Sequence, residues 1–171
     1  MVTVTPNPSK EDAKIVIDNI REIEKKEIEN FLHSPIFAAM DSIRGSKYSF
    51  CVKDSEGKPI ALTGIADSPV DTDLRTGIVW LISSTEVQNS SLSFYKSIKN
   101  LVQTYGHMYD RLFNFVNTDA TDHHKFIEAL GFSLTSEVWK SEGGGIGYTL
   151  FEMITPSGLS KIYYLESEQD E

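Results

Sequence analysis

The side chains that could do acid–base or metal chemistry are few in this sequence of 171 residues. Its four histidines include one adjacent pair, His123 and His124, in a segment with helical character. Neighbouring residues on a helix point about 100° apart, so this pair cannot chelate one ion. His33 and His107 have no ligand spacing to the pair, and the single cysteine, Cys51, excludes an intramolecular disulfide and a zinc site built on paired cysteines. We therefore expect no metal site, and a buried, inert thiol at Cys51.

A glycine-rich run, Gly143-Gly-Gly-Ile-Gly147, has the composition of a phosphate-binding loop. It lacks the Lys-Ser or Lys-Thr pair and the following helix that such a loop needs, so we interpret it as a hairpin connection. The sequence also lacks the Gly-x-Ser-x-Gly motif of esterases and the His-Glu-x-x-His motif of zinc proteases. No enzyme of these classes is therefore indicated.

The charge balance restricts the partners of the chain. Sixteen Lys and Arg residues face 25 Asp and Glu residues, which gives a formal net charge of −9. Nucleic acids and anionic membranes attract clustered positive charge, so direct binding to either is disfavoured. No apolar run approaches the roughly 20 residues of a membrane span, and the first residues lack the apolar core of a signal peptide. The composition, 40% hydrophobic, is typical of a globular chain. The single cysteine and the lack of a signal peptide lead us to expect that it works in a reducing cytoplasm, or in a particle assembled there.

The elements that must position any site follow from the hydrophobic period. The pattern predicts a short strand over 2–5, then one long or broken helix from about 10 to 33 with Ser9 as its N-cap. A second, short helix is predicted over 35–43, and Gly45 ends it.

From residue 48 onward the pattern alternates between period two and helical spacing. The run 78–82, Ile-Val-Trp-Leu-Ile, is apolar throughout, which is typical of a strand covered on both faces. The other predicted elements are a hairpin over 48–52 and 60–65, helices over 92–105 and 122–130, and strands over 112–116, 132–139 and 148–154. The predicted order is β α α β β β α β α β β, an α/β fold with a mixed central sheet and helices on both faces.

The last 17 residues differ in composition from the rest. Thr155-Pro-Ser-Gly158 interrupts the pattern, and an apolar patch, Ile162-Tyr-Tyr-Leu165, precedes an acidic end. We predict a domain over 1–154 and an acidic C-terminal tail over 155–171. The tail either docks on a partner, as an added strand or a docking segment, or packs back on its own domain.

The element order resembles the fold of GCN5-related N-acetyltransferases, the GNAT fold. The strongest local match runs from Leu112 to Phe132 and closes with Leu130-Gly131-Phe132, where the glycine fits the left-handed conformation of a helix end. Residues 1–154 are also similar to GNAT-like proteins and internal virion proteins of short-tailed phages. That likeness rests on a charged first-helix segment, a glycine hairpin and a strand with tryptophan: Arg21, Glu24, Glu27, Ser55 to Gly64, and Trp80.

The resemblance implies an acetyl-CoA cleft at the central strand and the helix that follows it. In GNAT enzymes an Arg/Gln-x-x-Gly-x-Gly/Ala motif there holds the pyrophosphate with its amides and the helix dipole. Gln88 fits the first position, whereas Ser91 and Ser93 replace the glycine and the small residue. Alternatively, Asn89 or Ser90 only caps the helix. The cofactor-binding residues that the resemblance implies are Ile82, Ser83, Gln88, Asn89, Ser90, Ser91, Ser93 and Asn117.

The catalytic groups of the family are incompletely matched. Many GNAT enzymes place a general-acid tyrosine four residues before the glycine of Leu-Gly-Phe, and this sequence has Ile127 there, which cannot donate a proton. The resemblance implies Glu86 as the candidate base. Alternatively, Glu86 is a loop acid that the dipole of the following helix stabilises.

Two functions remain open after this comparison. The first is a phage-encoded GNAT-like protein with a degenerate acetyl-CoA cleft, which binds a protein partner in the virion or the host. The second is an acetyl-CoA-dependent N-acetyltransferase of unknown acceptor. Both place the chain in the host cytoplasm, and the first also places it in the virion. Acetyl-CoA is the cofactor that the resemblance implies, without a metal.

Overall fold

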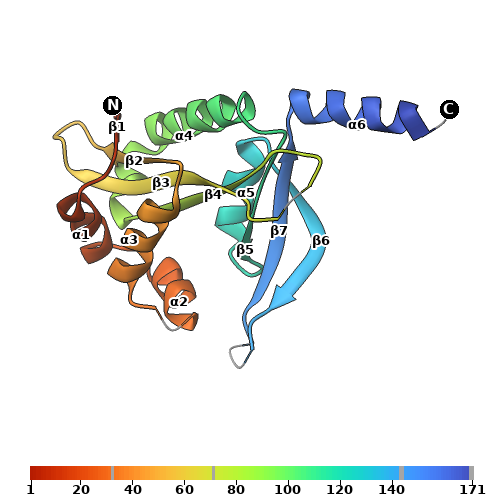
Figure 1. The fold of residues 1–171 in the computed structure, drawn as a ribbon. Helices are drawn as coiled ribbons and strands as arrows, with labels where there is room; N and C mark the ends of the chain where they lie inside the picture. Colours follow the sequence, from red (N-terminus) through yellow and green to blue (C-terminus); the bar gives the residue numbers. More distant parts are fainter. Residues whose placement is uncertain (32, 71, 143–144, 170–171) are drawn as a thin grey trace.

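A seven-stranded mixed sheet organises the molecule (Figure 1). The computed structural model describes residues 1–31, 33–70, 72–142 and 145–169. The strands lie in the order β1-β2-β3-β4-β5-β7-β6, and the β4–β5 pair is parallel whereas the other pairs are antiparallel. Their bounds are β1 (Thr3–Pro6), β2 (Tyr48–Lys53), β3 (Pro59–Asp67), β4 (Thr76–Ser83), β5 (Arg111–Asn117), β6 (Ser133–Lys140) and β7 (Gly147–Ile154).

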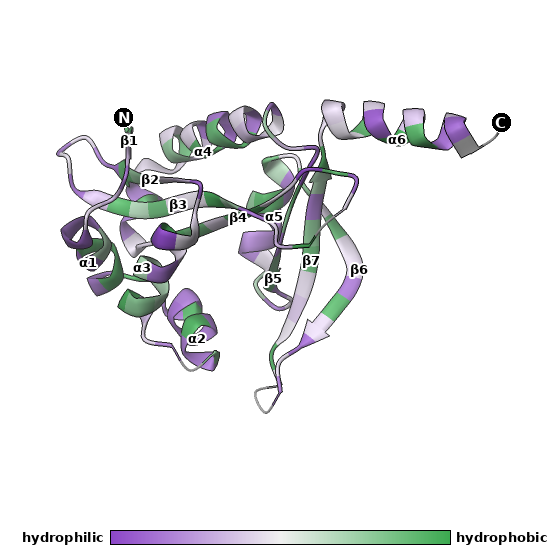
Figure 2. Ribbon diagram, viewed as in Figure 1, coloured by the Kyte–Doolittle hydropathy of each residue, from purple (hydrophilic) through white to green (hydrophobic). Residues whose placement is uncertain are grey.

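Helices cover both faces of the sheet, as predicted. Ala13 and Val16 of α1 and Ala39 of α3 form one core with Leu62 of β3. Helices α4 and α5 contribute to a larger core that contains Ala61, the neighbour of Leu62 on the other face. The helices are α1 (Lys10–Asp18), α2 (Glu22–Asn30), α3 (Pro35–Gly45), the 3-10 helix η1 (Thr85–Ser90), α4 (Ser91–Gly106), α5 (Thr121–Ala129) and α6 (Pro156–Gln169). Figure 2 shows apolar residues along β3 and β7, consistent with burial of the sheet between these layers.

The predicted first helix is broken into α1 and α2. The chain between them is extended because Ile20 forms a β-bridge with Ser84, just after the end of β4. The Arg21 amide donates to the Ser83 carbonyl at 3.4 Å, and the Thr85 amide donates to the Asn19 carbonyl at 3.0 Å. The break therefore fixes the start of α2 beside the carboxyl end of β4.

The central strand β4 lies in the middle of the sheet, as predicted, and both its faces pack on a core, with Val79 and Leu81 on one side and Trp80 and Ile82 on the other. Its neighbour β5 pairs with it only over 76–78 against 111–113, and the two strands separate beyond that point. The Asn114 side chain donates to the Val79 carbonyl at 2.6 Å where they part. Val79, Trp80 and Leu81 are consequently only half-buried.

The glycine turn that ends α5 agrees with the sequence analysis. Gly131 has φ of 104°, a conformation that residues with a Cβ rarely adopt. The Gly131 amide donates to the Glu128 carbonyl at 3.0 Å and the Phe132 amide donates to the Ile127 carbonyl at 3.3 Å, which is the Schellman pattern. The turn directs Phe132 into the core as β6 begins.

Residues 156–169 form helix α6, which extends beyond the body of the molecule (Figure 1). The interpretation of this segment as an added strand is therefore wrong, because its conformation is helical. The glycines at 143 and 144 lie outside the described residues. Among the residues that are described, no helix has the length and apolar character of a membrane span.

Candidate functional site

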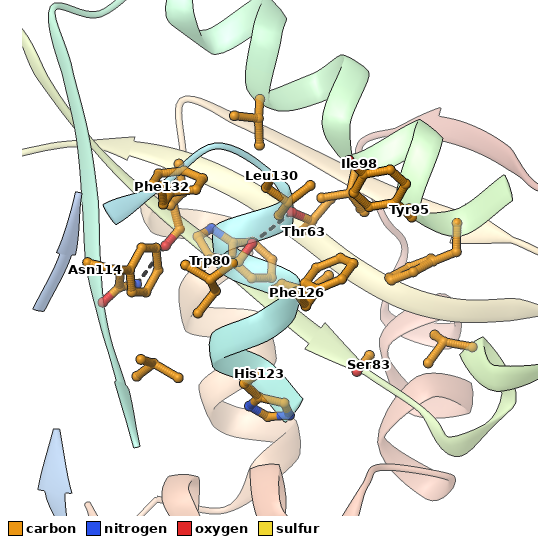
Figure 3. Close-up of a pocket in the computed structure, with 18 of the residues that line it drawn as sticks. Thr63, Trp80, Ser83, Tyr95, Ile98, Asn114, His123, Phe126, Leu130 and Phe132 are labelled. Carbon is orange, nitrogen blue, oxygen red and sulfur yellow. Dashed lines mark hydrogen bonds between the residues drawn. The ribbon is translucent and has the colours of Figure 1, made fainter. Parts of the chain in front are cut away.

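A cavity of about 420 Å³ occupies the gap where β4 and β5 separate (Figure 3). Its walls come from β4, β5, α4 and α5, and α2 closes one end. Most of the side chains that face it are apolar, among them Val79, Leu81, Ile98, Val116 and Leu130. A cavity of this size, apolar with a few polar groups at one end, has the usual character of a small-molecule site.

Three aromatic rings occupy the space between the start of α4 and the middle of α5. Phe94 stacks on Phe126 with ring centroids 6.0 Å apart and an angle of 19° between the planes. Tyr95 meets Phe126 edge-on at 6.3 Å, and the Tyr95 hydroxyl donates to the Ala129 carbonyl at 2.8 Å. These contacts tie the two helices together along the cavity wall, where Figure 3 labels Tyr95 and Phe126.

The polar end of the cavity is built around Glu24 of α2. Its buried carboxyl group accepts hydrogen bonds from the amide and the hydroxyl of Ser83, both at 2.7 Å. Burial raises the pKa of Glu24 to about 7, although the two hydrogen bonds from Ser83 and the charge of Arg21 lower it. A carboxyl group with such a pKa can gain or lose a proton near neutral pH.

His123 of α5 faces Glu24 across this end of the cavity, with Nε2 and Oε1 4.0 Å apart. Burial lowers the pKa of His123, and the positive charge of Arg21 acts in the same direction. His123 Nε2 and Glu27 Oε1 are both buried without a hydrogen-bond partner in the described part of the chain. Burial also raises the pKa of Glu27. Buried polar atoms of this kind are rare and mark places where a ligand or a water can bind.

Helix α2 is held at its far end as well as at Glu24. Phe31 stacks on Trp139 at 6.0 Å and contacts Tyr148 at 5.5 Å, so it joins α2 to the β6–β7 hairpin. The Asn30 side-chain amide donates to the Ser141 hydroxyl at 3.1 Å. These contacts fix α2 across the end of the gap, which holds Glu24 and Glu27 in place.

The residues predicted to bind the cofactor divide into three groups. Ser83, Gln88 and Ser91 line the cavity. Ile82 packs in the core on the α1–α3 side of the sheet. The remaining predicted residues are not among those lining the cavity; they are Asn89, Ser90, Ser93, Asn117 and the candidate base Glu86.

The start of α4 carries no side-chain cap. Ser90 occupies the N-cap position without a capping hydrogen bond, and the Asn89 side-chain amide (Nδ2) donates to the Glu86 carboxylate at 3.2 Å. The Ser93 hydroxyl donates to the Ser90 carbonyl at 3.3 Å. The alternative that Asn89 or Ser90 caps this helix is therefore wrong. Glu86 is also paired with Lys58 at 3.7 Å.

Two comparisons with known proteins bear on this geometry. A family model described as "Bacteriophage T7, probable scaffold protein Gp13" matches residues 72–139, from just before β4 into β6. The spermidine N-acetyltransferase from Vibrio cholerae, solved with CoA and spermine, superposes with a TM-score of 0.66 at 12% identity, covering 92% of this chain and 98% of that chain. The chain has the GNAT fold.

Other acetyltransferases of the GNAT fold match in the same way. The ribosomal-protein-S18-alanine N-acetyltransferase from Escherichia coli has a TM-score of 0.61 at 14% identity, covering 91% of this chain and 95% of that chain. The IAA acetyltransferase from Bacillus cereus has a TM-score of 0.58 at 13% identity, with 90% and 99% covered. No curated protein matches the chain. At these identities the likeness establishes the GNAT fold alone.

The acidic and imidazole groups at the end of the cavity were not predicted as a site. Glu24 and Glu27 entered the sequence analysis only as part of a charged segment, and His123 only as a possible metal ligand. Glu24 and Glu27 are three residues apart, which places both carboxylates on one side of α2, and this spacing is the signal that could have indicated a shared site. Within the described ranges, no three His, Cys, Asp or Glu residues form a group that could hold a metal ion.

Proposed function

We propose that this chain is a phage-encoded assembly protein that acts chiefly by binding another protein, with a GNAT fold whose acetyl-CoA cleft is degenerate. The match of residues 72–139 to a scaffold-protein family supports the assembly role. The observation that carries the proposal is the Phe94–Phe126 stack, which forms the cavity wall between α4 and α5 and which we expect to narrow the path of a cofactor beside α4. Ser91 adds a Cβ where the family has a glycine, and Ser93 adds a hydroxyl group where the family has a glycine or an alanine.

The charge of the chain agrees with this reading. From Gly77 to Tyr95 the sequence contains no Lys or Arg, so the segment corresponding to the pyrophosphate loop offers no cation to a ligand with three phosphates. The net charge of −9 disfavours nucleic acid and anionic membrane as partners. The partner is therefore a protein of the assembling particle or of the host, and the chain binds it in the host cytoplasm. If the partner belongs to the particle, the chain is carried into the virion with it.

Titration with acetyl-CoA tests the degenerate cleft. Ligand binding stabilises a fold by an amount that follows the logarithm of ligand concentration over Kd, so a working cleft would give a thermal shift at millimolar acetyl-CoA. We expect no shift for the wild-type chain or for Ser91→Glu. A shift in the wild type that Ser91→Glu abolishes would contradict the proposal. Quantitative mass spectrometry of procapsids and virions from the phage that encodes the chain tests the assembly role.

A second candidate function, N-acetyl transfer, is favoured by the groups at the polar end of the cavity. An amine must lose a proton as it attacks the thioester carbonyl, giving the N-acetyl product and free CoA thiol. Glu24 and His123 lie 4.0 Å apart, and either could accept that proton. The uncapped start of α4 would leave backbone amides for an anion.

Thiol release from acetyl-CoA in the presence of an amine panel tests this candidate. If acyl transfer occurs, Glu24→Gln should lower kcat by about 10²–10⁴-fold, the range for loss of a general base. Glu22→Gln is the matched control, because Glu22 is an exposed carboxylate on the same helix. Absence of thiol release in the wild type would leave the binding function as the better description.

A further inference from the structure

The first turns of α6 are fixed to the body through one buried carboxylate. Asp110, at the start of β5, is fully buried and accepts hydrogen bonds from Lys161 Nζ at 2.6 Å, the Ser157 hydroxyl at 2.6 Å and the Arg75 guanidinium at 3.2 Å. Burial by itself raises the pKa of Asp110, but these donors overcome it and hold the pKa well below its usual range. Gly158 packs directly against the Asp110 carbonyl, where a Cβ would not fit.

The outer turns of α6 are free of the body. The Tyr163 and Tyr164 side chains are 72% and 63% exposed, and Leu159 is also exposed. Leu159 and Tyr163 are four residues apart and therefore share one face of the helix. Figure 1 shows this part of α6 extending away from the sheet. A short helix is marginal in water by itself, so the Asp110 anchor is what gives its exposed face a defined direction.

The free charges on α6 are acidic. Its one basic residue, Lys161, forms an ion pair with Asp110, whereas Glu166 and Glu168 are exposed. Within a chain of net charge −9, this acidic end of α6 disfavours a second copy of the chain and an anionic bilayer as the surface that covers the helix. A basic protein surface complements it.

We propose that α6 is a docking helix that inserts Leu159, Tyr163 and Tyr164 into an apolar groove of a partner protein whose rim carries Lys and Arg. Tyrosine is enriched among the residues that dominate interface energies, and helices commonly bind in grooves through residues three or four apart, as Leu159 and Tyr163 are. Tyr164 lies about 100° around the helix from Tyr163 and extends the contact to the side of that face. The pre-set direction of the helix lowers the ordering cost of binding. The proposal rests on the proposed function, in which the partner belongs to the assembling particle.

Incorporation into procapsids of the encoding phage tests the apolar contact. We expect the double variant Tyr163→Ser with Tyr164→Ser to reduce the copies per procapsid at least tenfold while the melting temperature of the purified protein stays unchanged. Tyr48→Ser is the matched control, because Tyr48 is an exposed tyrosine on β2, and it should be incorporated like the wild type. Undiminished incorporation of the double variant would overturn the docking helix.

The acidic end of α6 is tested by charge reversal. Glu166→Lys with Glu168→Lys should reduce incorporation by a similar factor, whereas Glu56→Lys, in the exposed β2–β3 turn, should not. If the Glu166→Lys, Glu168→Lys variant and the Glu56→Lys variant are incorporated to the same extent, the proposal that the partner groove has a basic rim is overturned.

Two measurements on the purified chain address the other surfaces that could cover α6. A dimer in sedimentation equilibrium that the Tyr163–Tyr164 double variant loses would assign the helix to self-association and overturn the proposal. Flotation with vesicles of phosphatidylethanolamine and phosphatidylglycerol would assign it to a membrane, with the same consequence. Failure of the wild-type chain to enter procapsids would overturn the assembly role itself, and this inference with it, whereas incorporation of wild type and variant alike overturns the inference alone.

Discussion

At the scale of single residues, Glu24 is the group whose surroundings differ most from its sequence context. It lies in a run of polar residues, Glu24 to Glu27, yet its carboxyl group is buried against Ser83 and faces His123. Because the carboxyl group is buried and its pKa is raised from 4.5 to about 7, the folded state binds a proton there that the unfolded state has already lost. Stability is therefore expected to depend on pH through this side chain.

Glu24→Gln should remove that dependence. Between pH 4.5 and 7 the folded wild type binds more protons at Glu24 than the unfolded chain, so the contribution of this group falls as pH rises. From pH 4.5 to pH 8 the free energy of unfolding of the variant should rise by up to about 3 kcal/mol relative to that of the wild type. This value follows from about 1.4 kcal/mol for each unit by which the pKa is raised. Glutamine can still accept from the Ser83 amide and donate to its hydroxyl.

Thermal melts of both proteins from pH 5 to 8 measure this effect. His123 has a lowered pKa and contributes the opposite slope, so stability of Glu24→Gln should rise with pH up to about 6.5, the ordinary histidine value. Glu22→Gln should follow the wild-type curve, since its carboxylate is exposed. Parallel curves for wild type and Glu24→Gln would show that Glu24 is ionised in the folded state throughout this range.

The burial of Glu24 also shows why the site was only partly predictable. Ser83, Gln88 and Ser91 were found from the sequence because they belong to a local strand–helix connection with a family pattern. Glu24 and His123 come from α2 and α5, about 100 residues apart in the chain. Their proximity depends on how these helices meet at the end of β4, which no local pattern encodes.

At the scale of elements, most strands and helices were predictable because their hydrophobic periods are strong. The exceptions depend on long-range contacts. The break before α2 requires the pairing of Ile20 with Ser84, and the half-burial of β4 requires its separation from β5. Pro156 and Gly158 were interpreted as an interruption, whereas Pro156 begins a helix and Gly158 allows its close approach to the Asp110 backbone.

Asp110→Asn tests the attachment of α6. The variant should lose about 2–3 kcal/mol at pH 7, because Lys161 and Arg75 then face an amide instead of a buried carboxylate. The depressed pKa means that the stabilisation is present above the unfolded value of about 4 and is lost as pH falls below it. The stability difference between wild type and variant should therefore shrink from pH 5 toward pH 3.

Urea denaturation at pH 7, 5 and 3 measures this difference. Asp18→Asn is the control, because Asp18 is an exposed acid paired only with Lys14 on α1. It should change stability by less than about 0.5 kcal/mol at each pH. A difference between wild type and Asp110→Asn that stays constant down to pH 3 would mean that the carboxylate is not held in its charged form by these donors.

At the scale of the whole molecule, the sheet and its two cores are complete without α6. Thr155 already closes β7 onto the body, since its amide donates to the Asp110 carbonyl at 3.0 Å and its hydroxyl donates to the Tyr109 carbonyl at 2.8 Å. Neither hydrophobic core includes a residue of α6. We therefore propose that residues 1–155 are an independent folding unit that carries the cavity, and that α6 is an appendage that presents a binding face.

A chain that ends at Thr155 tests this division. It should unfold in a single transition with nearly the m-value of the full chain, because the outer turns of α6 are already exposed and add little buried surface. It should be less stable by about 2 kcal/mol, since Asp110 loses its bonds from Ser157 and Lys161 and keeps those from Arg75.

The same truncation in an Asp110→Asn background should cost less, because the two changes remove the same interactions. Circular dichroism and urea titration of the four proteins give the coupling energy. A truncated chain that does not fold would place α6 inside the folding unit, and an additive result would show that Asp110 is not what attaches α6 to the body.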